Sequence, residues 1–292
     1  MKHSVKELEL KANDLRREII QMLVAAGSGH SAGPLGMADV FTAVFFEAAK
    51  LDPKRPDWAE RDRIVLSNGH IAPVLYAVMA ETGFFPKTEL KTLRKFGSRL
   101  QGHPERLRLP GVENTSGPLG NGLPQAAGMA LGFRMDGTKQ HVWCFTGDGE
   151  LNEGVIWEAA MFAAAKKLNN LTVIVDRNNI QIDGYTENVM PLEPLADKWR
   201  AFGWHVIEVD GHNIADVIAA CGQAQAVFER PTVIIAHTIP GKGVNYMEQD
   251  PVWHGMPPGL KDVTGDPPKD EQAKVALADL RTLRGKIRSE HE

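Results

Sequence analysis

Apolar positions along this chain repeat with two periods, one typical of amphipathic helices and the other of buried strands. Leu8, Leu15 and Ile19 belong to a stripe at helical spacing that runs to about Ala26, and Ser4 and Glu7 open this segment with a capping-box pattern. Further helices are predicted over residues 37–50, 123–135, 150–167 and 214–228. Short β-prone apolar runs lie between helices at residues 64–66, 141–146, 171–175, 205–209 and 232–237. The alternation predicts an α/β fold, a doubly wound parallel sheet flanked by helices.

Three glycine-rich loops interrupt the regular pattern, at residues 27–36, 97–122 and 240–262. Long irregular loops in a compact domain often carry function, so they are candidate parts of a binding site. After the last loop, apolar residues at helical spacing predict a terminal helix over about residues 270–288. We therefore expect one domain over residues 1–262, followed by a linker and helical tail over residues 263–292.

Composition and charge narrow the class of protein. The chain has 292 residues, of which 43% are hydrophobic, and a formal net charge of −4. The length allows a sizeable core, and the negative charge gives no electrostatic basis for binding nucleic acid or an anionic membrane. The two cysteines, Cys144 and Cys221, are too few for a disulfide framework. With no apolar signal region and no run of about 18 apolar residues, we expect a cytoplasmic protein that does not span a membrane.

The strongest chemical signal is a strand, a turn, a helix, a second strand and an asparagine, ending at residues 178–179. Asp148 lies in a Gly-Asp-Gly turn after a predicted buried strand, and the glycines leave room for a ligand beside the backbone. Asn178 follows the next strand. Because the carboxyl ends of neighbouring parallel strands meet at one edge of a sheet, Asp148 and Asn178 should lie together. A carboxylate, an amide oxygen and a backbone carbonyl would supply half of the oxygen shell of Mg²⁺ or Ca²⁺, and a diphosphate and water would supply the rest.

Several separate motifs, in order from about residue 10 to about residue 260, resemble the transketolase family of thiamine diphosphate enzymes and specifically its N-terminal, diphosphate-binding half. They are SGHSAGPLG at 28–36, SNGH at 67–70, GSRLQGHPE at 97–105, SGPLGNG at 116–122, GDGELNEG at 147–154, NNIQIDG at 178–184 and VWHG at 252–255. The resemblance implies thiamine diphosphate as cofactor and a divalent metal, which would be Mg²⁺ or else Ca²⁺ or Mn²⁺.

The resemblance also implies a role for individual residues. The implied metal ligands are Asp148, Asn178 and the backbone carbonyl of Ile180. The implied cofactor-binding residues are His70, Gly149 and His254 near the diphosphate, Gly117 and Leu119 near the aminopyrimidine, and Gly147, Asp148, Glu153, Asn178 and Ile182. The implied catalytic residues, which would contact substrate hydroxyls and transfer protons, are His30, His103 and His254.

One departure from the family is large. A full-length transketolase continues into a pyrimidine-binding domain and a third domain, whereas this sequence stops at Glu292. The family's catalytic glutamate and main sugar-phosphate contacts belong to those domains. The resemblance therefore implies the N-terminal subunit of a split transketolase, which transfers a two-carbon ketol unit from a ketose phosphate to an aldose phosphate, as in pentose phosphate metabolism. We expect it to act only with a separate C-terminal subunit, in a heterotetramer.

Three other interpretations remain open. The first is the α subunit of a 2-oxo acid dehydrogenase, which also carries a Gly-Asp-Gly…Asn motif, although the SNGH and QGHPE segments favour transketolase. The second is a non-catalytic binding or regulatory subunit, against which the intact Asp148, Asn178 and loop histidines count. The third is a specialised transketolase for an unusual sugar.

Several candidate residues also have ordinary structural explanations. His30, His70, His103 and His254 stand out among ten histidines because each lies in a glycine-flanked loop, and imidazole can relay protons near neutral pH. Their spacing is not that of a zinc site. Glu153 either couples paired sites at a dimer interface, as the matching glutamate does in the family, or is a first-turn acid favoured by the helix dipole. Lys242 either meets a phosphate or is a solvated loop lysine.

Overall fold

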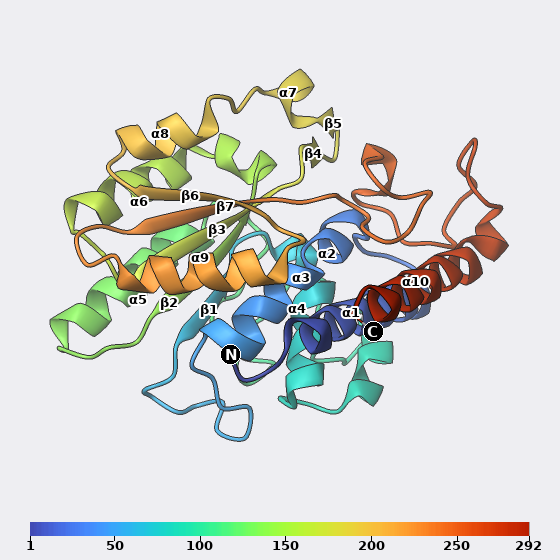
Figure 1. Cartoon of the computed structure of the whole chain (residues 1–292), viewed down its shortest axis with the longest axis horizontal. Coiled ribbons are helices and arrows are strands. Elements are labelled where there is room, and N and C mark those ends of the chain that lie inside the picture. The colour runs from blue at the N-terminus through green and yellow to red at the C-terminus, as the bar shows by residue number, and fades with distance from the viewer. Residues whose placement is uncertain (292) are drawn as a thin grey trace.

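The computed structural model describes residues 1–291 and forms them around a five-stranded parallel sheet with helices on both faces (Figure 1). The strand order is β1-β2-β3-β7-β6. The strands are β1 (Arg63–Leu66), β2 (Val142–Gly147), β3 (Leu171–Arg177), β6 (His205–Asp210) and β7 (Thr232–His237). The predicted fold class is confirmed, and all five predicted strands form within two residues of their expected limits.

Burial at the centre of the sheet explains why the sequences of β2 and β3 are almost continuously apolar. Every residue of β2 and β3 is buried, as expected for strands that are covered by helices on both faces. Their parallel register places Gly147 opposite Asp176. The carboxyl ends of β2 and β3 therefore lie side by side, and the polar residues that follow them share one edge of the sheet.

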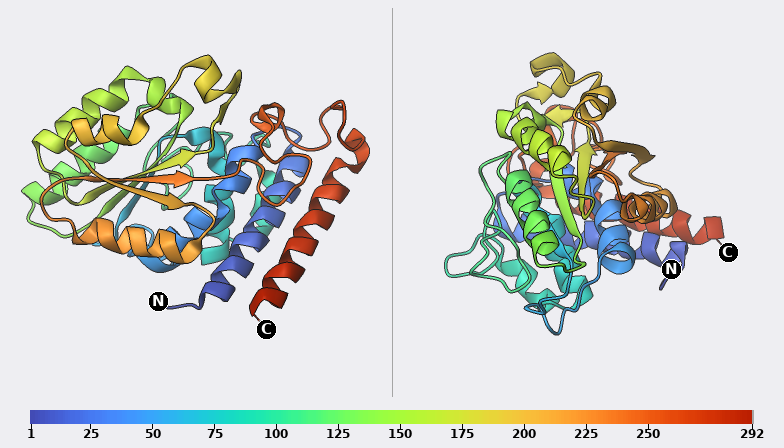
Figure 2. Two further views of the ribbon diagram at one scale, coloured as in Figure 1. Left: turned by 45° about the horizontal axis from the view of Figure 1, so that its top comes forward. Right: turned by 90° about the vertical axis from the view of Figure 1, so that its left-hand side faces the viewer.

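The sheet separates the hydrophobic core into two parts, and a layer of helices covers each. One face of the sheet is covered by α3 (Ala38–Ala43), α4 (Ala72–Thr82) and α9 (Ile214–Ala226), with α1 (Val5–Ala26) packed outside α3 and α4. The other face is covered by α5 (Gly122–Met135), α6 (Gly154–Ala165) and α8 (Leu195–Ala201). Figure 2 shows α9 on the opposite side of the sheet from α5 and α6.

The ends of α1 form as its sequence predicts. The Ser4 side chain accepts a hydrogen bond from the backbone of Glu7, the Glu7 side chain accepts one from the backbone of Ser4, and the helix ends at Gly27 in the left-handed conformation. Leu8, Leu15 and Ile19 are fully buried, so the predicted stripe is the packed face of the helix. The helical tail α10 (Lys269–His291) packs along α1 and buries Ala276 and Leu280 in the same core.

Some boundaries differ from the prediction for physical reasons. The expected loop over residues 27–36 ends in a short helix, α2 (Ala32–Gly36), because tertiary contacts bury all five of its residues. Gly36 is required there, since a Cβ on it would lie 2.9 Å from the carbonyl oxygen of Ile239. The helix expected over residues 37–50 is α3 followed by a π-helical segment, η1 (Val44–Ala48). The helix expected over residues 150–167 breaks at Glu153, into the 3-10 turn η4 (Gly149–Asn152) and α6.

The remaining elements are short and were not predicted. They are η2 (Gly69–Ile71), η3 (Lys87–Thr92), β4 (Ile180–Gln181), β5 (Gly184–Tyr185), α7 (Thr186–Val189) and η5 (Pro251–Trp253). Of the helices in the described residues, none combines the length and the apolar character needed to cross a membrane. The division into residues 1–262 and a tail over residues 263–292 stays a prediction, and Glu292 lies outside the described residues.

Candidate cofactor-binding site

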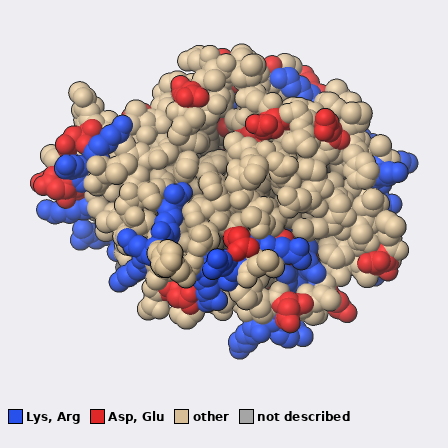
Figure 3. Space-filling model, turned by 180° about the vertical axis from the view of Figure 1, so that it is seen from behind, with Lys and Arg blue, Asp and Glu red and all other residues tan. Residues whose placement is uncertain are grey.

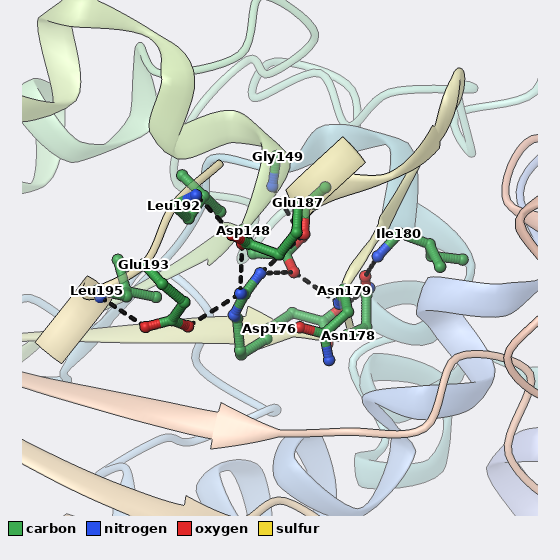
Figure 4. Close-up of polar contacts among 12 residues, drawn as sticks. Asp148, Gly149, Asp176, Asn178, Asn179, Ile180, Glu187, Leu192, Glu193 and Leu195 are labelled. Atoms are coloured by element: carbon green, nitrogen blue, oxygen red, sulfur yellow. Dashed lines mark hydrogen bonds and ion pairs between the residues drawn. The ribbon is translucent and has the colours of Figure 1, made fainter. Parts of the chain in front are cut away.

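The predicted meeting of Asp148 and the segment after β3 occurs at the carboxyl edge of the sheet (Figure 4). Oδ2 of Asp148 accepts a hydrogen bond from the backbone N–H of Asn179 at 2.7 Å, and Oδ1 accepts one from the N–H of Gly149 at 2.7 Å. The Asn178 amide oxygen accepts from the N–H of Ile180 at 3.0 Å. The carboxylate and the amide are thus held in fixed orientations by the backbone that follows each strand.

Arg177 is a part of this site that the sequence pattern did not reveal. Its guanidinium lies 3.1 Å from Oδ2 of Asp148, and it also pairs with Glu187 at 2.8 Å and Glu193 at 3.0 Å. Thr186 accepts a further hydrogen bond from it at 2.9 Å. The last residue of β3 therefore joins the Gly-Asp-Gly turn to α7 and the segment after it.

A second buried carboxylate, Asp176, lies beside Asp148. Its oxygens accept hydrogen bonds from the Thr238 hydroxyl at 2.5 Å and from the Asn178 amide nitrogen at 2.8 Å. Burial raises the pKa of Asp176 to about 7, and the neighbouring Asp148 contributes in the same direction. Burial also raises the pKa of Asp148 to about 6, although the N–H of Asn179 and the Arg177 guanidinium act against this. Asp176 fixes the orientation of the Asn178 side chain through the amide nitrogen.

These residues supply the donor set of a hard divalent cation rather than of zinc. In the described part of the chain no three His, Cys, Asp or Glu side chains come together as a metal-binding group. Asp148, Asn178 and Ile180 nevertheless line the same pocket. One carboxylate, one amide oxygen and one backbone carbonyl suit a cation whose shell is completed by phosphate oxygens and water.

Glu150 was also not predicted, and it connects three of the motif loops. Its buried carboxylate accepts hydrogen bonds from the Ser67 hydroxyl, from the N–H of Gly120 at 2.6 Å and from the N–H of Gly147 at 2.9 Å. Burial raises the pKa of this carboxyl, and the hydrogen bond from Ser67 opposes the rise. The loops at residues 67–70, 116–122 and 147–154 are therefore fixed to one another by one side chain.

Three of the predicted histidines form a compact triangle. The ring centroids of His30, His70 and His254 are 5.0 to 5.5 Å apart. Burial lowers the pKa of His30 to about 3 and that of His254 to about 4, and it lowers the pKa of His70 well below its usual value. All three imidazoles are neutral near pH 7. The buried Nδ1 atoms of His30 and His254 have no hydrogen-bond partner among the described residues.

His103 lies at the open side of the pocket and is exposed. Gly117 faces its ring, because a Cβ on Gly117 would lie 3.7 Å from the imidazole. Partial burial of the imidazole lowers the pKa of His103, and the nearby positive charge of Arg94 lowers it further. Leu119 and Ile182 are exposed hydrophobic residues on the same pocket.

One pocket brings nearly all the predicted site residues together. It has an empty volume of about 800 Å³, part of it open to solvent. Its lining includes His30, His70, His103, Gly117, Leu119, Gly147, Asp148, Gly149, Asn178, Ile180, Ile182 and His254, together with Glu150, Asp176 and Gln181. Glu153 is not in the lining: it is exposed at the start of α6, with its Cβ near Gly120. Lys242 lines a different pocket, beside α10.

A buried cluster behind the site holds the loop that carries His254. Nδ1 of His212 lies 2.8 Å from Oδ2 of Asp39, which also pairs with Arg16 at 2.5 Å. Nε2 of His212 accepts a hydrogen bond from the N–H of Ile239 at 2.8 Å. His212 therefore fixes the start of the loop at residues 240–262 to α3. The Ser31 hydroxyl supports the other end by donating to the carbonyl of Met256 at 2.7 Å.

Comparisons with known proteins identify a family and relatives for this chain. Residues 9–266 match the family described as "Transketolase, thiamine diphosphate binding domain". The chain is 44% identical over 250 residues to the 6-deoxy-6-sulfo-D-fructose transketolase subunit SqwG of Clostridium sp. (strain MSTE9), covering 86% of this chain and 91% of that protein. It is 41% identical over 254 residues to a subunit of the apulose-4-phosphate transketolase of Phocaeicola vulgatus, covering 87% of this chain and 90% of that protein.

A solved structure shows the same fold. The transketolase of Campylobacter jejuni superposes with a TM-score of 0.83 at 30% sequence identity, over 98% of this chain and 48% of that chain. The chain therefore spans about half the length of that transketolase and nearly the whole length of the two subunit relatives.

Proposed function

The chain belongs to the transketolase family, and we propose that it is the diphosphate-binding subunit of a split transketolase, which transfers a two-carbon ketol unit from a ketose to an aldose. The observation that carries this proposal is the convergence of the motif loops on one pocket. Its lining includes a buried Asp–Asn pair, a glycine turn and a triangle of neutral histidines. This is the environment that a diphosphate, its metal and a sugar would share.

The residues present fit thiamine diphosphate. The pocket is large enough for part of such a cofactor, and Gly147 and Gly149 expose backbone along one wall. When bound, the cofactor supplies the electron sink for cleaving and forming carbon–carbon bonds. His70 and Gly149 would contact the diphosphate, and Gly117 and Leu119 would pack near the aminopyrimidine. Gln181 lines the same pocket beside Gly149, because a Cβ on Gly149 would lie 3.2 Å from the Gln181 Cβ.

We further propose that Asp148, Asn178 and the carbonyl of Ile180 hold the divalent metal, for which Mg²⁺ is the physiological choice. The Asp148 carboxylate is preset by two backbone N–H groups at 2.7 Å, and Asp176 presets the Asn178 amide. A site whose ligands are already oriented loses little entropy on binding. Phosphate oxygens and water would complete the six-oxygen shell.

His30, His103 and His254 are the proposed contacts for substrate hydroxyls and proton transfer. Neutral imidazoles can accept a proton at one nitrogen while donating from the other. The imidazoles of His30 and His254 both line the pocket. His103, at the exposed side, would meet the substrate as it enters.

A second, different polypeptide would complete the site. The apulose-4-phosphate relative is named as one subunit of its enzyme, which implies at least one other chain for that protein. On this chain the face opposite α9 carries few charged side chains over its centre (Figure 3). Along α6, Met161 is 58% and Phe162 is 40% exposed. Exposed apolar surface of this kind marks interaction sites, and we propose that a chain with a pyrimidine-binding domain covers it, in a heterotetramer.

The relatives also favour a specialised substrate. One is named for a sulfonated ketose and the other for apulose 4-phosphate. We therefore keep a transketolase for an unusual anionic sugar as the second candidate, within the same reaction class.

The proposal is tested by pulling the chain down from its native cell and identifying its partners by mass spectrometry. We expect a stoichiometric partner that carries a pyrimidine-binding domain. The reconstituted pair, with thiamine diphosphate and Mg²⁺, should transfer ketol units from a ketose phosphate, while each chain alone should not. A folded chain that recruits no partner and supports no transfer would instead indicate a binding or regulatory protein.

A further inference from the structure

The residue before His254 is tied to chain that lies beyond the loop at residues 240–262. The indole Nε1 of Trp253 donates a hydrogen bond to Oδ2 of Asp266 at 2.9 Å, and the Trp253 side chain is fully buried. The ring of Tyr246 packs edge-on against the indole, with ring centroids 5.0 Å apart. A buried indole N–H needs an acceptor, and Asp266 supplies it from residues 263–291, which we call the C-terminal segment.

Gln272, near the start of α10, makes a second set of contacts between this segment and the loop. Its side chain is fully buried. Oε1 accepts a hydrogen bond from the N–H of Gly259 at 2.8 Å, while Nε2 donates to the carbonyls of Lys261 at 3.1 Å and Pro267 at 3.2 Å. The backbone carbonyl of Gln272 accepts from the Tyr246 hydroxyl at 2.9 Å. Gln272 therefore joins α10 to the loop on both sides of its histidine.

The body of α10 supports the first part of the loop. A Cβ on Gly243 would lie 2.9 Å from Cδ2 of Leu280, and the N–H of Asn245 donates to the Asp279 carboxylate at 3.0 Å. Trp253 and Leu280 belong to the same hydrophobic core, and α10 lies along α1 (Figure 2). The loop thus rests on a helix that is itself packed on the domain.

Residues of the pocket hold the opposite side of the loop. A Cβ on Gly255 would lie 2.7 Å from Cδ1 of Ile182 and 3.7 Å from Nε2 of His30. His254 lies between Gly255 and Trp253 in the chain, so its backbone is fixed from the pocket on one side and from the C-terminal segment on the other. A displacement of Trp253 would therefore move His254 relative to His30.

We propose that the C-terminal segment contributes to the active site, with Asp266 and Gln272 acting as positioning residues for His254. The inference rests on the proposed function and extends it to a part of the chain outside the pocket, since neither side chain belongs to the pocket lining. Each acts only through the loop. Catalytic groups must be held to within about 0.5 Å of their productive places, so a small loosening of the loop is enough to slow the reaction.

The first test is an NMR titration of the His254 imidazole in the full chain, without partner or cofactor. Burial lowers the pKa of this imidazole to about 4. Asp266→Ala removes the acceptor of the Trp253 indole, so the loop should loosen and water should reach His254. The pKa should then rise to about 5 or higher, towards its ordinary value. Asp266→Asn keeps an oxygen acceptor at the same place and should restore the low pKa.

Variants on the other side of these contacts keep the test decisive even if Asp266→Ala fails to fold. Trp253→Phe removes the same hydrogen bond but keeps an aromatic ring, so it should raise the pKa of His254 in the same way. The double variant should raise it no further, because both changes remove one bond. Gln272→Ala, which frees the loop at Gly259, should act in the same direction. A pKa that stays at about 4 in all these variants would overturn the proposal.

Kinetics of the reconstituted complex give the second readout. In Asp266→Ala, kcat should fall about 10- to 100-fold, as expected when a catalytic group is misplaced, and Asp266→Asn should recover most of it. The matched control is Arg284→Gln, which breaks the pair between α10 and Asp14 of α1 without touching the loop, and should leave kcat unchanged. An equal loss in Arg284→Gln and Asp266→Ala would overturn the proposal, because it would indicate that the segment only stabilises the fold.

The two readouts separate this inference from the proposed function. A raised pKa of His254 in Asp266→Ala would support the positioning role even if no partner gave ketol transfer. Active transfer by the complex, together with an unchanged pKa in Asp266→Ala, would refute the positioning role and leave the proposed function intact.

Discussion

The guanidinium of Arg177 lies 3.1 Å from the Asp148 carboxylate, and both side chains are almost completely buried. The positive charge of Arg177 therefore balances the negative charge of the Asp148 carboxylate even without a bound metal. Asp176 adds a second buried carboxylate beside Asp148, and its hydrogen-bond partners are the Thr238 hydroxyl and the Asn178 amide. The edge of the sheet is thus organised for positive charge, from Arg177 on one side and, in our proposal, from a metal on the other.

Replacing Arg177 with glutamine should destabilise the chain in the absence of ligands. Removing one member of a buried ion pair leaves the other charge uncompensated, which costs about 3 kcal/mol or more. A bound divalent cation would restore the missing positive charge. The stabilisation by Mg²⁺ with thiamine diphosphate, measured by chemical denaturation, should therefore be larger in Arg177→Gln than in the unmodified protein.

Arg200→Gln is the matched control for this experiment, because Arg200 pairs with Asp197 at 2.7 Å on the surface, where it is half exposed. Its loss should change the free energy of unfolding by less than about 1 kcal/mol, with no dependence on ligand. If Mg²⁺ and cofactor stabilise Arg177→Gln less than they stabilise the unmodified protein, Arg177 orients the ligands more than it balances charge.

Replacing Glu150 with glutamine should weaken cofactor binding while the fold survives. The amide presents N–H donors where the carboxylate accepts from Gly120 and Gly147, so at least one buried N–H loses its partner. Because Glu150 connects the loops of the pocket, we expect thiamine diphosphate affinity to fall about 5- to 100-fold, corresponding to about 1–3 kcal/mol. Calorimetric titration of the assembled complex measures this loss. The exposed Glu158→Gln on α6 should bind normally, and equal affinity in both variants would contradict the role given to Glu150.

The sequence predicted those parts of the site that depend on local pattern. Apolar runs located β2 and β3, and parallel neighbours bring their carboxyl ends together whatever the rest of the fold does, so Asp148 and the segment at Asn178 could be placed in advance. Glycine-flanked loops identified the histidines in the same way. The fold class and family are confirmed, whereas the roles of the individual residues stay predictions.

Contacts between distant segments could not be predicted from pattern. His212 received no role from the sequence, because its partners Asp39 and Ile239 lie 173 and 27 residues away and nothing local signals them. Glu150 reaches Ser67 across 83 residues. Arg177 did offer a usable signal, since two charged residues, Asp176 and Arg177, end a mostly apolar strand next to Asn178. The role of Glu153 stays a prediction: the residue is exposed at the start of α6 and does not line the pocket.

His141 should make the chain less stable in acid. Burial lowers its pKa to about 4 in the folded state, and its Nε2 lies 2.8 Å from the Thr172 hydroxyl. In the unfolded chain the pKa returns to about 6.5, so between these values the unfolded chain binds a proton that the folded chain does not. Stability must then fall as the pH falls through this window, by up to roughly 3 kcal/mol from this residue. Denaturation curves at several pH values should show a slope about one proton smaller in His141→Gln, and identical slopes would refute the assignment.

Asp148→Asn should abolish the metal dependence of cofactor binding. The substitution keeps the shape of the side chain but removes the charge on which a hard cation depends. In the assembled complex, thiamine diphosphate affinity measured in Mg²⁺ should fall about 100-fold, corresponding to about 3 kcal/mol, and should then match the affinity measured in EDTA. Asp183→Asn, an exposed acid that follows Ile182 of the pocket lining, should retain the full Mg²⁺ effect. Equal, Mg²⁺-dependent affinity in Asp148→Asn and the unmodified protein would show that Asp148 is not a metal ligand.

Asn178→Ala, which removes the second proposed ligand, should also weaken Mg²⁺-dependent binding of thiamine diphosphate. A variant that kept full affinity would show that Asn178 is not part of the metal site.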